Sequence, residues 1–278
     1  MRKNIQDFQG MKEAGIKISM LTAYDASMSS LLSECGTDML LVGDSLGMVV
    51  LGYDSTVPVT MEQMVHHASA VRRGAPDIFV VGDMPFGSYQ TGIRDAINNG
   101  LKFIKESDCD AVKLEGGQEV CEVVSALVRS GISVMGHLGL TPQTASQLGG
   151  YKVQGKELPA AEKMVADARA LQDAGVFAIV LECVPEELST LISKDLKIPT
   201  IGIGAGAGCD GQVLVINDML GMFEKFTPKF VKHYAKLAPL MKQGVQEYLA
   251  EVKSGTFPAA EQGFSCATDY SSIFREEE

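Results

Sequence analysis

The sequence lacks both a surplus of positive charge and any apolar run long enough to cross a membrane. Its 278 residues include 24 Lys and Arg against 35 Asp and Glu, which gives a net charge of −11 at pH 7. A chain this acidic repels nucleic-acid phosphates and anionic lipid surfaces. Spanning a bilayer takes about 20 consecutive apolar residues. We therefore expect neither nucleic acid nor a membrane as a partner, and an anionic substrate would need cations placed locally.

Several motifs of other protein classes are also missing. The six cysteines form no Cys-x-x-Cys pair, and none of the four histidines stands at zinc-ligand spacing. The N-terminus has no apolar signal core. The glycines between 202 and 208 lack the dinucleotide-binding spacing, and no Gly-x-Ser-x-Gly motif occurs. These absences predict a cytoplasmic protein with reduced thiols and disfavour zinc enzymes, Rossmann domains and serine hydrolases.

Short runs rich in Val and Ile alternate with longer helical patterns along most of the chain. Runs that are apolar on both faces suit strands buried between a packed interior and outer helices. Roughly eight such runs are present, the number that closes a parallel (β/α)8 TIM barrel. Only seven residues separate the last two runs, so the seventh helical unit is expected to be truncated. The expected strands are 18–23, 39–43, 78–82, 111–114, 133–136, 178–181, 199–204 and 212–216.

The helical segments carry their own start and stop signals. Thr60 and Gln63 form a capping box, and glycines follow the helical patterns. Internal helices are expected at 60–73, 118–129 and 162–173. Thr227 and Pro228 are predicted to begin a long extra C-terminal helix, because proline is tolerated in a first turn.

The chain is predicted to hold a single barrel domain over residues 1–255 and a loosely ordered tail over 256–278. Two connections, 46–59 and 141–159, are long and both follow strands. Loops after barrel strands lie on the face where active sites form, so these two are candidate lids or substrate-binding segments. The alternative is that they are surface loops without a role in binding.

Two of the apolar runs end in Gly-Asp, at Asp44 and Asp83, and a third acid, Glu115, follows another run. Parallel barrel strands deliver their C-terminal ends to one mouth, so these carboxylates are expected to meet. Oxygen ligands of this kind suit a hard cation such as Mg²⁺. The alternative is that the acids cap following helices, which explains one or two of them better than all three.

Further polar residues stand at the expected strand ends. Lys113 and Glu115 lie two apart and so point to the same side, where Lys113 needs a partner, either an anionic substrate or Glu115 itself. Glu182 is flanked by apolar residues and should resist ionisation, as a general base requires; pairing with a nearby cation is the alternative. His137 reads either as a hydrogen-bonding residue or as a participant in catalysis. The remaining members of this set are Tyr24, Asp25, Ser45 and Asp218.

Several ordered segments resemble the ketopantoate hydroxymethyltransferase family. They include Gly43-Asp44-Ser45-Leu46-Gly47-Met48 and Gly136-His137-Leu138-Gly139-Leu140-Thr141-Pro142-Gln143. The other matching segments are 54–60, 83–89, 112–117, 149–155, 181–185 and 201–206. Together they cover the chain from about Thr22 to Gly255, and their number makes the resemblance specific.

The resemblance implies a barrel of the phosphoenolpyruvate/pyruvate type and a one-carbon transfer. In that reaction, 3-methyl-2-oxobutanoate and 5,10-methylenetetrahydrofolate give 2-dehydropantoate and tetrahydrofolate through a Mg-stabilised enolate, as the first step of pantothenate and coenzyme A biosynthesis. It also implies one Mg²⁺ per subunit and a homo-oligomer, typically a decamer.

The resemblance further implies a role for each matching site residue. Asp44 and Asp83 would bind Mg²⁺, with Glu115 completing the metal site, and Glu182 would be the catalytic proton acceptor. The implied keto-acid contacts are Asp44, Ser45, Asp83 and Lys113. His137 and Lys152 are possible additional site residues, and Lys152 and Lys156 are hypothesised to attract the anionic folate tail.

Two other functions are compatible with the same residues. One is a different Mg²⁺-dependent lyase or mutase acting on 2-oxo acids. The other is a barrel that binds a small molecule without catalysis. The motifs specify neither the folate-binding residues, nor the oligomer interfaces, nor a preference among Mg²⁺, Mn²⁺ and Co²⁺.

Overall fold

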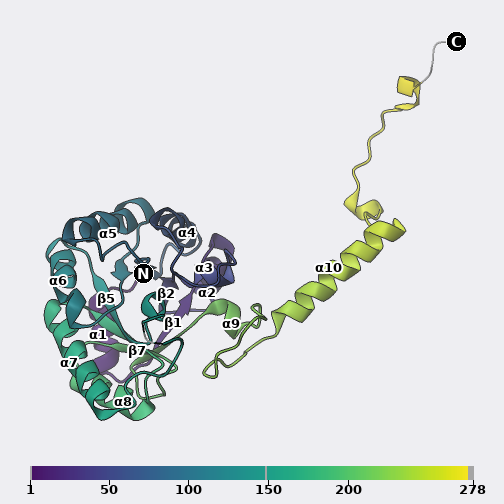
Figure 1. Ribbon diagram of the computed structural model, residues 1–278. Helices are drawn as coiled ribbons and strands as arrows, with labels where there is room; N and C mark the ends of the chain where they lie inside the picture. Colours follow the sequence, from purple (N-terminus) through teal and green to yellow (C-terminus); the bar gives the residue numbers. More distant parts are fainter. Residues whose placement is uncertain (1, 148, 275–278) are drawn as a thin grey trace.

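A computed structural model describes residues 2–147 and 149–274, and its main feature is a closed barrel of eight parallel strands (Figure 1). Each strand pairs with its neighbours in sequence order, and β1 closes the ring against β8. The predicted (β/α)8 barrel is therefore confirmed. The strands are β1 (Ile18–Thr22), β2 (Met39–Val42), β3 (Phe79–Asp83), β4 (Ala111–Lys113), β5 (Val134–Gly139), β6 (Ala178–Glu182), β7 (Thr200–Ile203) and β8 (Gly211–Leu214).

Side chains alternate along each strand between the inside of the barrel and the outer helices. On β4, Val112 belongs to the outer core, whereas Ala111 belongs to the interior cluster. That interior is filled with large side chains, so the barrel has a packed core toward the N-terminal ends of its strands. The N-terminal helix α1 (Ile5–Glu13) closes this end, because Phe8 packs edge-on against Phe79 with ring centroids 5.1 Å apart. Only the opposite mouth remains for a binding cavity.

Outer helices cover the strands, and three of them correspond to the helices expected from the sequence, although α7 begins four residues earlier than predicted and α6 follows a short 3-10 turn. Thr60 and Gln63 form the expected capping box at the start of α4, and Gly175, in the left-handed conformation, ends α7. The covering helices are α2 (Ala26–Glu34), α4 (Met61–Gly74), α5 (Ile93–Ser107), α6 (Cys121–Arg129), α7 (Leu158–Ala174) and α8 (Glu186–Asp195). No helix lies between β7 and β8 in the described residues 204–210, which confirms the truncated seventh unit. Short elements at the loops are α3 (Leu46–Val49), η1 (Gln118–Val120), η2 (Pro142–Thr144) and α9 (Ile216–Met219).

The prediction for the start of the C-terminal helix is wrong. Helix α10 spans Leu237–Ser254, and the segment from Thr227 to Lys236 is irregular. Phe230 supplies the reason: its ring lies against Gly204 at the end of β7, where an added Cβ would stand 2.7 Å from the ring, and it packs on the interior cluster. This tertiary contact holds the segment over the barrel mouth, and it outweighs the helix-start signal of Thr227 and Pro228.

Helix α10 leaves the barrel and extends away from it, followed by η3 (Ala260–Gln262) and η4 (Ser271–Phe274) (Figure 1). Among its residues, Ala238 alone is buried. The domain limit at residue 255 stays a prediction. The helices described in the structure include none with the length and apolar content needed to cross a membrane.

Candidate active site

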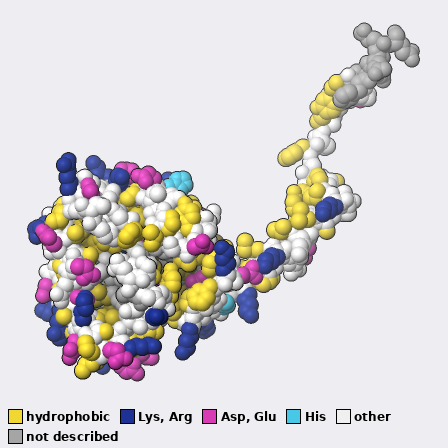
Figure 2. Space-filling model, viewed as in Figure 1, with side chains coloured by type: hydrophobic (Ala, Val, Ile, Leu, Met, Phe, Trp, Pro, Cys, Tyr) yellow, Lys and Arg dark blue, Asp and Glu magenta, His cyan; other side chains and the backbone are white. Residues whose placement is uncertain are grey.

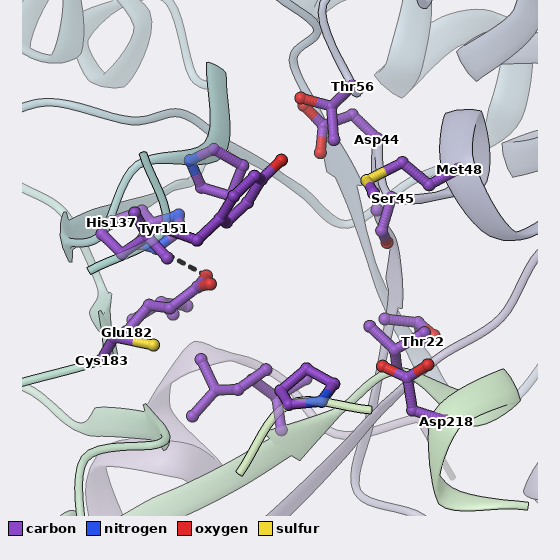
Figure 3. Close-up of a pocket in the computed structure, with 18 of the residues that line it drawn as sticks. Thr22, Asp44, Ser45, Met48, Thr56, His137, Tyr151, Glu182, Cys183 and Asp218 are labelled. Carbon is purple, nitrogen blue, oxygen red and sulfur yellow. Dashed lines mark ion pairs between the residues drawn. The ribbon is translucent and has the colours of Figure 1, made fainter. Parts of the chain in front are cut away.

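A cavity of about 600 Å³ opens at the C-terminal ends of the barrel strands. Figure 3 shows its walls: Asp44, Ser45 and Thr56 on one side face His137 and Glu182 on the other. The cavity thus lies where parallel barrels place their active sites. Of the residues expected at the site from the sequence, those lining this cavity are Asp44, Ser45, Asp83, Lys113, Glu115, His137, Lys152, Glu182 and Asp218.

Three carboxylates meet in the depth of the cavity and are almost completely buried. Asp83 ends β3, Asp44 follows β2, and Glu115 follows β4; their exposures are 2%, 4% and 5%. The backbone N–H of Asp44 donates to Asp83 Oδ2 over 3.2 Å, which links the first two acids directly. Burial raises the pKa of Asp44 well above its usual value, and the negative charges of Asp83 and Glu115 raise it further.

A single buried lysine balances part of this charge. The Nζ atom of Lys113 lies 2.7 Å from Asp83 Oδ1 and 3.9 Å from Glu115 Oε1. Burial would lower the pKa of Lys113, but the nearby carboxylates, Asp83 first, raise it overall. The lysine is therefore charged, and its partner within the protein is chiefly Asp83, a pairing that the sequence left open.

The acids are close together but do not form a ready-made metal cluster. Within residues 2–147 and 149–274, no group of three or more His, Cys, Asp or Glu side chains is arranged to hold a metal ion. Two of the carboxylates are already bound by donors of the protein. Gln143 Nε2 lies 2.9 Å from Asp44 Oδ2, and Lys113 is paired with Asp83. The three buried carboxylates outnumber the two cationic side chains beside them, Lys113 and His137. Such an oxygen-rich set fits a hard divalent cation.

His137, on β5, lies between the buried acids and Glu182. Its Nε2 is 3.3 Å from Glu182 Oε2 (Figure 3). Its Nδ1 is 3.5 Å from Glu115 Oε1 and 3.3 Å from Lys113 Nζ. Burial and the charge of Lys113 would lower the pKa of His137, but its contacts with Glu115 and Glu182 raise it to about 9. His137 thus connects Glu182 with Glu115 and Lys113.

The backbone around Glu182, the last residue of β6, is unusually constrained. Gly139 packs so closely that an added Cβ would lie 2.1 Å from the Glu182 carbonyl oxygen, and that oxygen accepts a bond of 2.8 Å from the N–H of Leu140. Cys183, the next residue, has φ +49°, which is uncommon for a residue other than glycine. The Glu182 side chain is 16% exposed. It is therefore fixed in position yet accessible from the cavity.

Gln143 is a central site residue that the strand-end reasoning missed. It is 3% exposed; its Nε2 donates to Asp44 and to the Met84 carbonyl, each over 2.9 Å, and its N–H donates to Glu115 over 3.1 Å. The Tyr89 hydroxyl donates to its Oε1 over 2.8 Å. Gln143 sits in η2, within the motif Gly-Leu-Thr-Pro-Gln, so only the motif signalled it.

Other expected site residues have mixed outcomes. The Tyr24 hydroxyl lies 2.9 Å from Ser45 Oγ and so joins β1 to the site. Asp25 does not belong to the cavity: it is exposed and accepts the N–H of Met28 as the N-cap of α2, the role the sequence offered as the alternative for such acids. Lys152 lines the cavity, whereas Lys156 is exposed and outside its lining.

Comparison with known proteins assigns the chain to a family. The family model for ketopantoate hydroxymethyltransferase matches residues 2–260. The chain belongs to that family. It is 67% identical over 270 residues to the 3-methyl-2-oxobutanoate hydroxymethyltransferase of Desulfotalea psychrophila, covering 97% of each chain. It is 59% identical over 256 residues to the enzyme of that name from Syntrophus aciditrophicus, covering 92% of this chain and 94% of that one. The protein is accordingly a hydroxymethyltransferase.

Solved structures of lower identity share the fold of this hydroxymethyltransferase. Phosphonopyruvate hydrolase, solved with oxalate and Mg²⁺, aligns with a TM-score of 0.61 at 9% identity, over 95% of this chain and 92% of that one. The 2,3-dimethylmalate lyase aligns with a TM-score of 0.57 at 17% identity, over 97% and 93%. The lyase is a member of the PEP mutase/isocitrate lyase superfamily. The barrel type expected from the sequence agrees with these neighbours.

Proposed function

We propose that this enzyme transfers the one-carbon unit of 5,10-methylenetetrahydrofolate to 3-methyl-2-oxobutanoate. The products are 2-dehydropantoate and tetrahydrofolate, water supplies the hydroxyl oxygen, and the reaction opens pantothenate biosynthesis. The observation that carries the proposal is the 67% identity, over 97% of both chains, to a relative named for this keto acid. No comparable observation favours a lyase, because the lyase neighbours share only the fold.

The buried acids are the proposed metal site. Asp44 and Asp83 would hold Mg²⁺ directly and Glu115 through water, consistent with their burial and excess negative charge. Bound there, Mg²⁺ would act as a Lewis acid on the oxygens of the 2-oxo acid. Lys113 is placed to offset the charge of the substrate carboxylate, and the hydroxyl of Ser45, held by Tyr24, faces the same part of the cavity.

Glu182 is the proposed general base that takes the C3 proton of the keto acid. It is the carboxylate on the wall opposite Asp44, and it is accessible to a ligand in the cavity (Figure 3). His137 would hold Glu182 in place through the 3.3 Å contact. The carbon freed of its proton then forms a bond to the one-carbon unit while the carbon–nitrogen bond of the folate breaks.

Exchange of the C3 proton in deuterated water tests this assignment without folate. We expect Mg²⁺-dependent exchange with the wild type and a loss of about 10²- to 10⁴-fold in Glu182→Gln, the range for removal of a general base. Glu187→Gln, on the adjoining α8 and exposed, is the matched control. Exchange at the wild-type rate in Glu182→Gln would remove Glu182 as the base. Consumption of the keto acid only when methylenetetrahydrofolate is present would exclude a lyase and a purely binding barrel.

The lysines of the long 141–159 connection are proposed to attract the anionic tail of the folate. Lys152 lines the cavity at an exposed position, while Lys156 stands outside it. Replacing both with Ala should raise the KM for polyglutamylated methylenetetrahydrofolate, with the larger part due to Lys152. An unchanged KM would contradict this role.

We further propose that the enzyme associates with copies of itself through α10. Its exposed apolar residues include Met241, Val245, Tyr248 and Val252, which recur at helical spacing and therefore form one stripe on the helix surface. Figure 2 shows apolar side chains exposed along this helix. A stripe of this kind on a helix detached from its own barrel favours a second copy as the covering surface. The decamer and the cytoplasmic location stay predictions from the sequence.

A further inference from the structure

The proposed binding of the keto acid and the metal leaves one part of the cavity without a role. It is formed by the end of β1, by β8 and by the segment that follows β8, and it lies across the cavity from Glu182 (Figure 3). Its lining residues are Thr22, Val213, Val215, Asp218, Phe223, Phe226, Pro228, Lys229 and Phe230. We call this region the β8 subsite. Its walls are mostly apolar and aromatic, and Asp218 is its one carboxylate.

Asp218 has no partner within the described part of the chain. It is half-buried in α9, and its carboxylate takes part in no hydrogen bond or ion pair with residues 2–147 or 149–274. Burial raises the pKa of Asp218 to about 6, and the charge of His233 offsets only part of the rise. Figure 3 shows the carboxylate beside Thr22 at the edge of the open space. A half-buried acid directed at a cavity suits a ligand that donates hydrogen bonds.

The position of Asp218 is set by the barrel itself. The hydroxyl of Thr22 on β1 accepts the N–H of Ile216 over 2.9 Å, which attaches the first residue of α9 to the strand. Phe230 is also held by the barrel, in this case through packing: its ring lies against Gly204 and the interior cluster. Both the carboxylate and one aromatic wall are therefore present before any ligand binds, which lowers the cost of ordering them.

The chemistry of the β8 subsite suits a pterin better than the keto acid. An anionic 2-oxo acid would be repelled by Asp218. The pterin ring of a folate carries two adjacent donors, the 2-amino group and N3–H, which pair with a carboxylate through two parallel hydrogen bonds, as a guanidinium does. Its flat ring packs on aromatic side chains.

We propose that Asp218 binds the 2-amino and N3–H edge of the folate pterin, with Phe223 and Phe230 lining the ring. This inference rests on the proposed function. The bound edge lies at the end of the pterin away from N5, so holding it at Asp218 directs the one-carbon unit back toward Glu182 and Asp44. The exposed Lys229 and Lys152 also line the cavity and would meet the glutamate tail.

Calorimetric titration under anaerobic conditions tests the proposal with two probes. Tetrahydrofolate contains the whole ligand, and 6-methyltetrahydropterin contains the ring without the tail. Asp218→Asn should raise the Kd of both probes about tenfold or more, equivalent to ~1.4 kcal/mol. Asp218→Glu, which keeps a carboxylate, should raise the Kd of both probes by a smaller factor. Glu224→Gln is the matched control: Glu224 is an acid of the same segment, is exposed and paired with Lys242, and lies outside the cavity lining.

The possible outcomes distinguish a failure of the β8 subsite from a failure of the proposed function. Binding of both probes by Asp218→Asn within twofold of the wild type would overturn the subsite and leave the proposed reaction intact. Failure of the wild type to turn over methylenetetrahydrofolate, with C3 exchange still present, would overturn the proposed reaction instead. Equal losses of probe affinity in Asp218→Asn and Asp218→Glu would also overturn the subsite. So would a fall in the rate of C3 exchange as large as the fall in folate affinity.

Discussion

The ammonium nitrogen of Lys113 lies 2.7 Å from Oδ1 of Asp83, and both side chains are buried at the floor of the cavity. The two residues end adjacent strands, β4 and β3, and stand opposite each other in the register. The pair therefore follows from the sheet itself. It joins one acid and one cation that would each be costly to bury alone.

Replacing Lys113 with Met should destabilise the metal-free protein by roughly 3–5 kcal/mol, because three buried carboxylates would lose their ammonium partner. Mg²⁺ should restore part of this loss, so the Mg²⁺-dependent rise in Tm should be larger in the variant than in the wild type. Thermal melts with EDTA and with Mg²⁺ give both quantities. Lys102→Met, at an exposed pair with Glu62, should change little. Equal Mg²⁺ responses in the wild type and Lys113→Met would contradict a metal site at these acids.

Replacing His137 with Ala should slow C3 exchange about 10- to 100-fold, the usual effect of removing a residue that orients a reacting group. The reason is the loss of the contact with Glu182. His137→Gln should recover part of the rate, since a glutamine amide there could donate a hydrogen bond to Glu182. Exchange rates at saturating keto acid provide the measurement, and the exposed His66→Ala is the control. A loss in His137→Ala that appears only in KM would argue against positioning of the base.

Replacing Asp218 with Asn should stabilise the protein at pH 8 but not at pH 4. The folded-state pKa of Asp218 is about 6, above the value of about 3.9 for an unfolded aspartate. The folded protein therefore binds this proton more tightly, and stability falls as pH rises from about 4 to 6. The two-unit shift is about 3 kcal/mol in full, and partial exposure reduces it to roughly 1 kcal/mol.

That change corresponds to about 2 °C in Tm for a chain of this size. Melts of the wild type, Asp218→Asn and Glu224→Gln at pH 8 and pH 4 provide the comparison. A lower Tm of Asp218→Asn at pH 8 would indicate that the carboxylate has a structural partner. A higher Tm of Asp218→Asn at pH 8 would fit a carboxylate that serves binding and lowers the stability of the protein.

The sequence predicts the barrel and the buried acids well because both depend on local patterns. The apolar runs define the strands, and the C-terminal ends of parallel strands lie at one mouth of the barrel, where Asp44 and Asp83 are found. Gln143 lies outside this rule: it enters the site from a loop, and its partners Asp44 and Tyr89 are far away in the sequence. The partners of a strand-end acid are likewise not encoded locally, so Asp25 and Asp218 looked alike although one caps a helix and the other faces the cavity.

Charged substitutions on the apolar stripe of α10 should reduce the size of the assembly. Met241→Glu together with Val245→Glu places two like charges within the stripe, and burying unpaired charges in an interface is costly. Because Met241 and Val245 are exposed and Ala238 is the buried residue of α10, these changes should leave the fold of the barrel intact. Sedimentation velocity of the wild type and the variant, with circular dichroism as a check on folding, measures the effect. Gln243→Glu, on the same helix and outside the stripe, is the control. An unchanged sedimentation coefficient in the double variant would show that the copies, if they associate, do so through another surface.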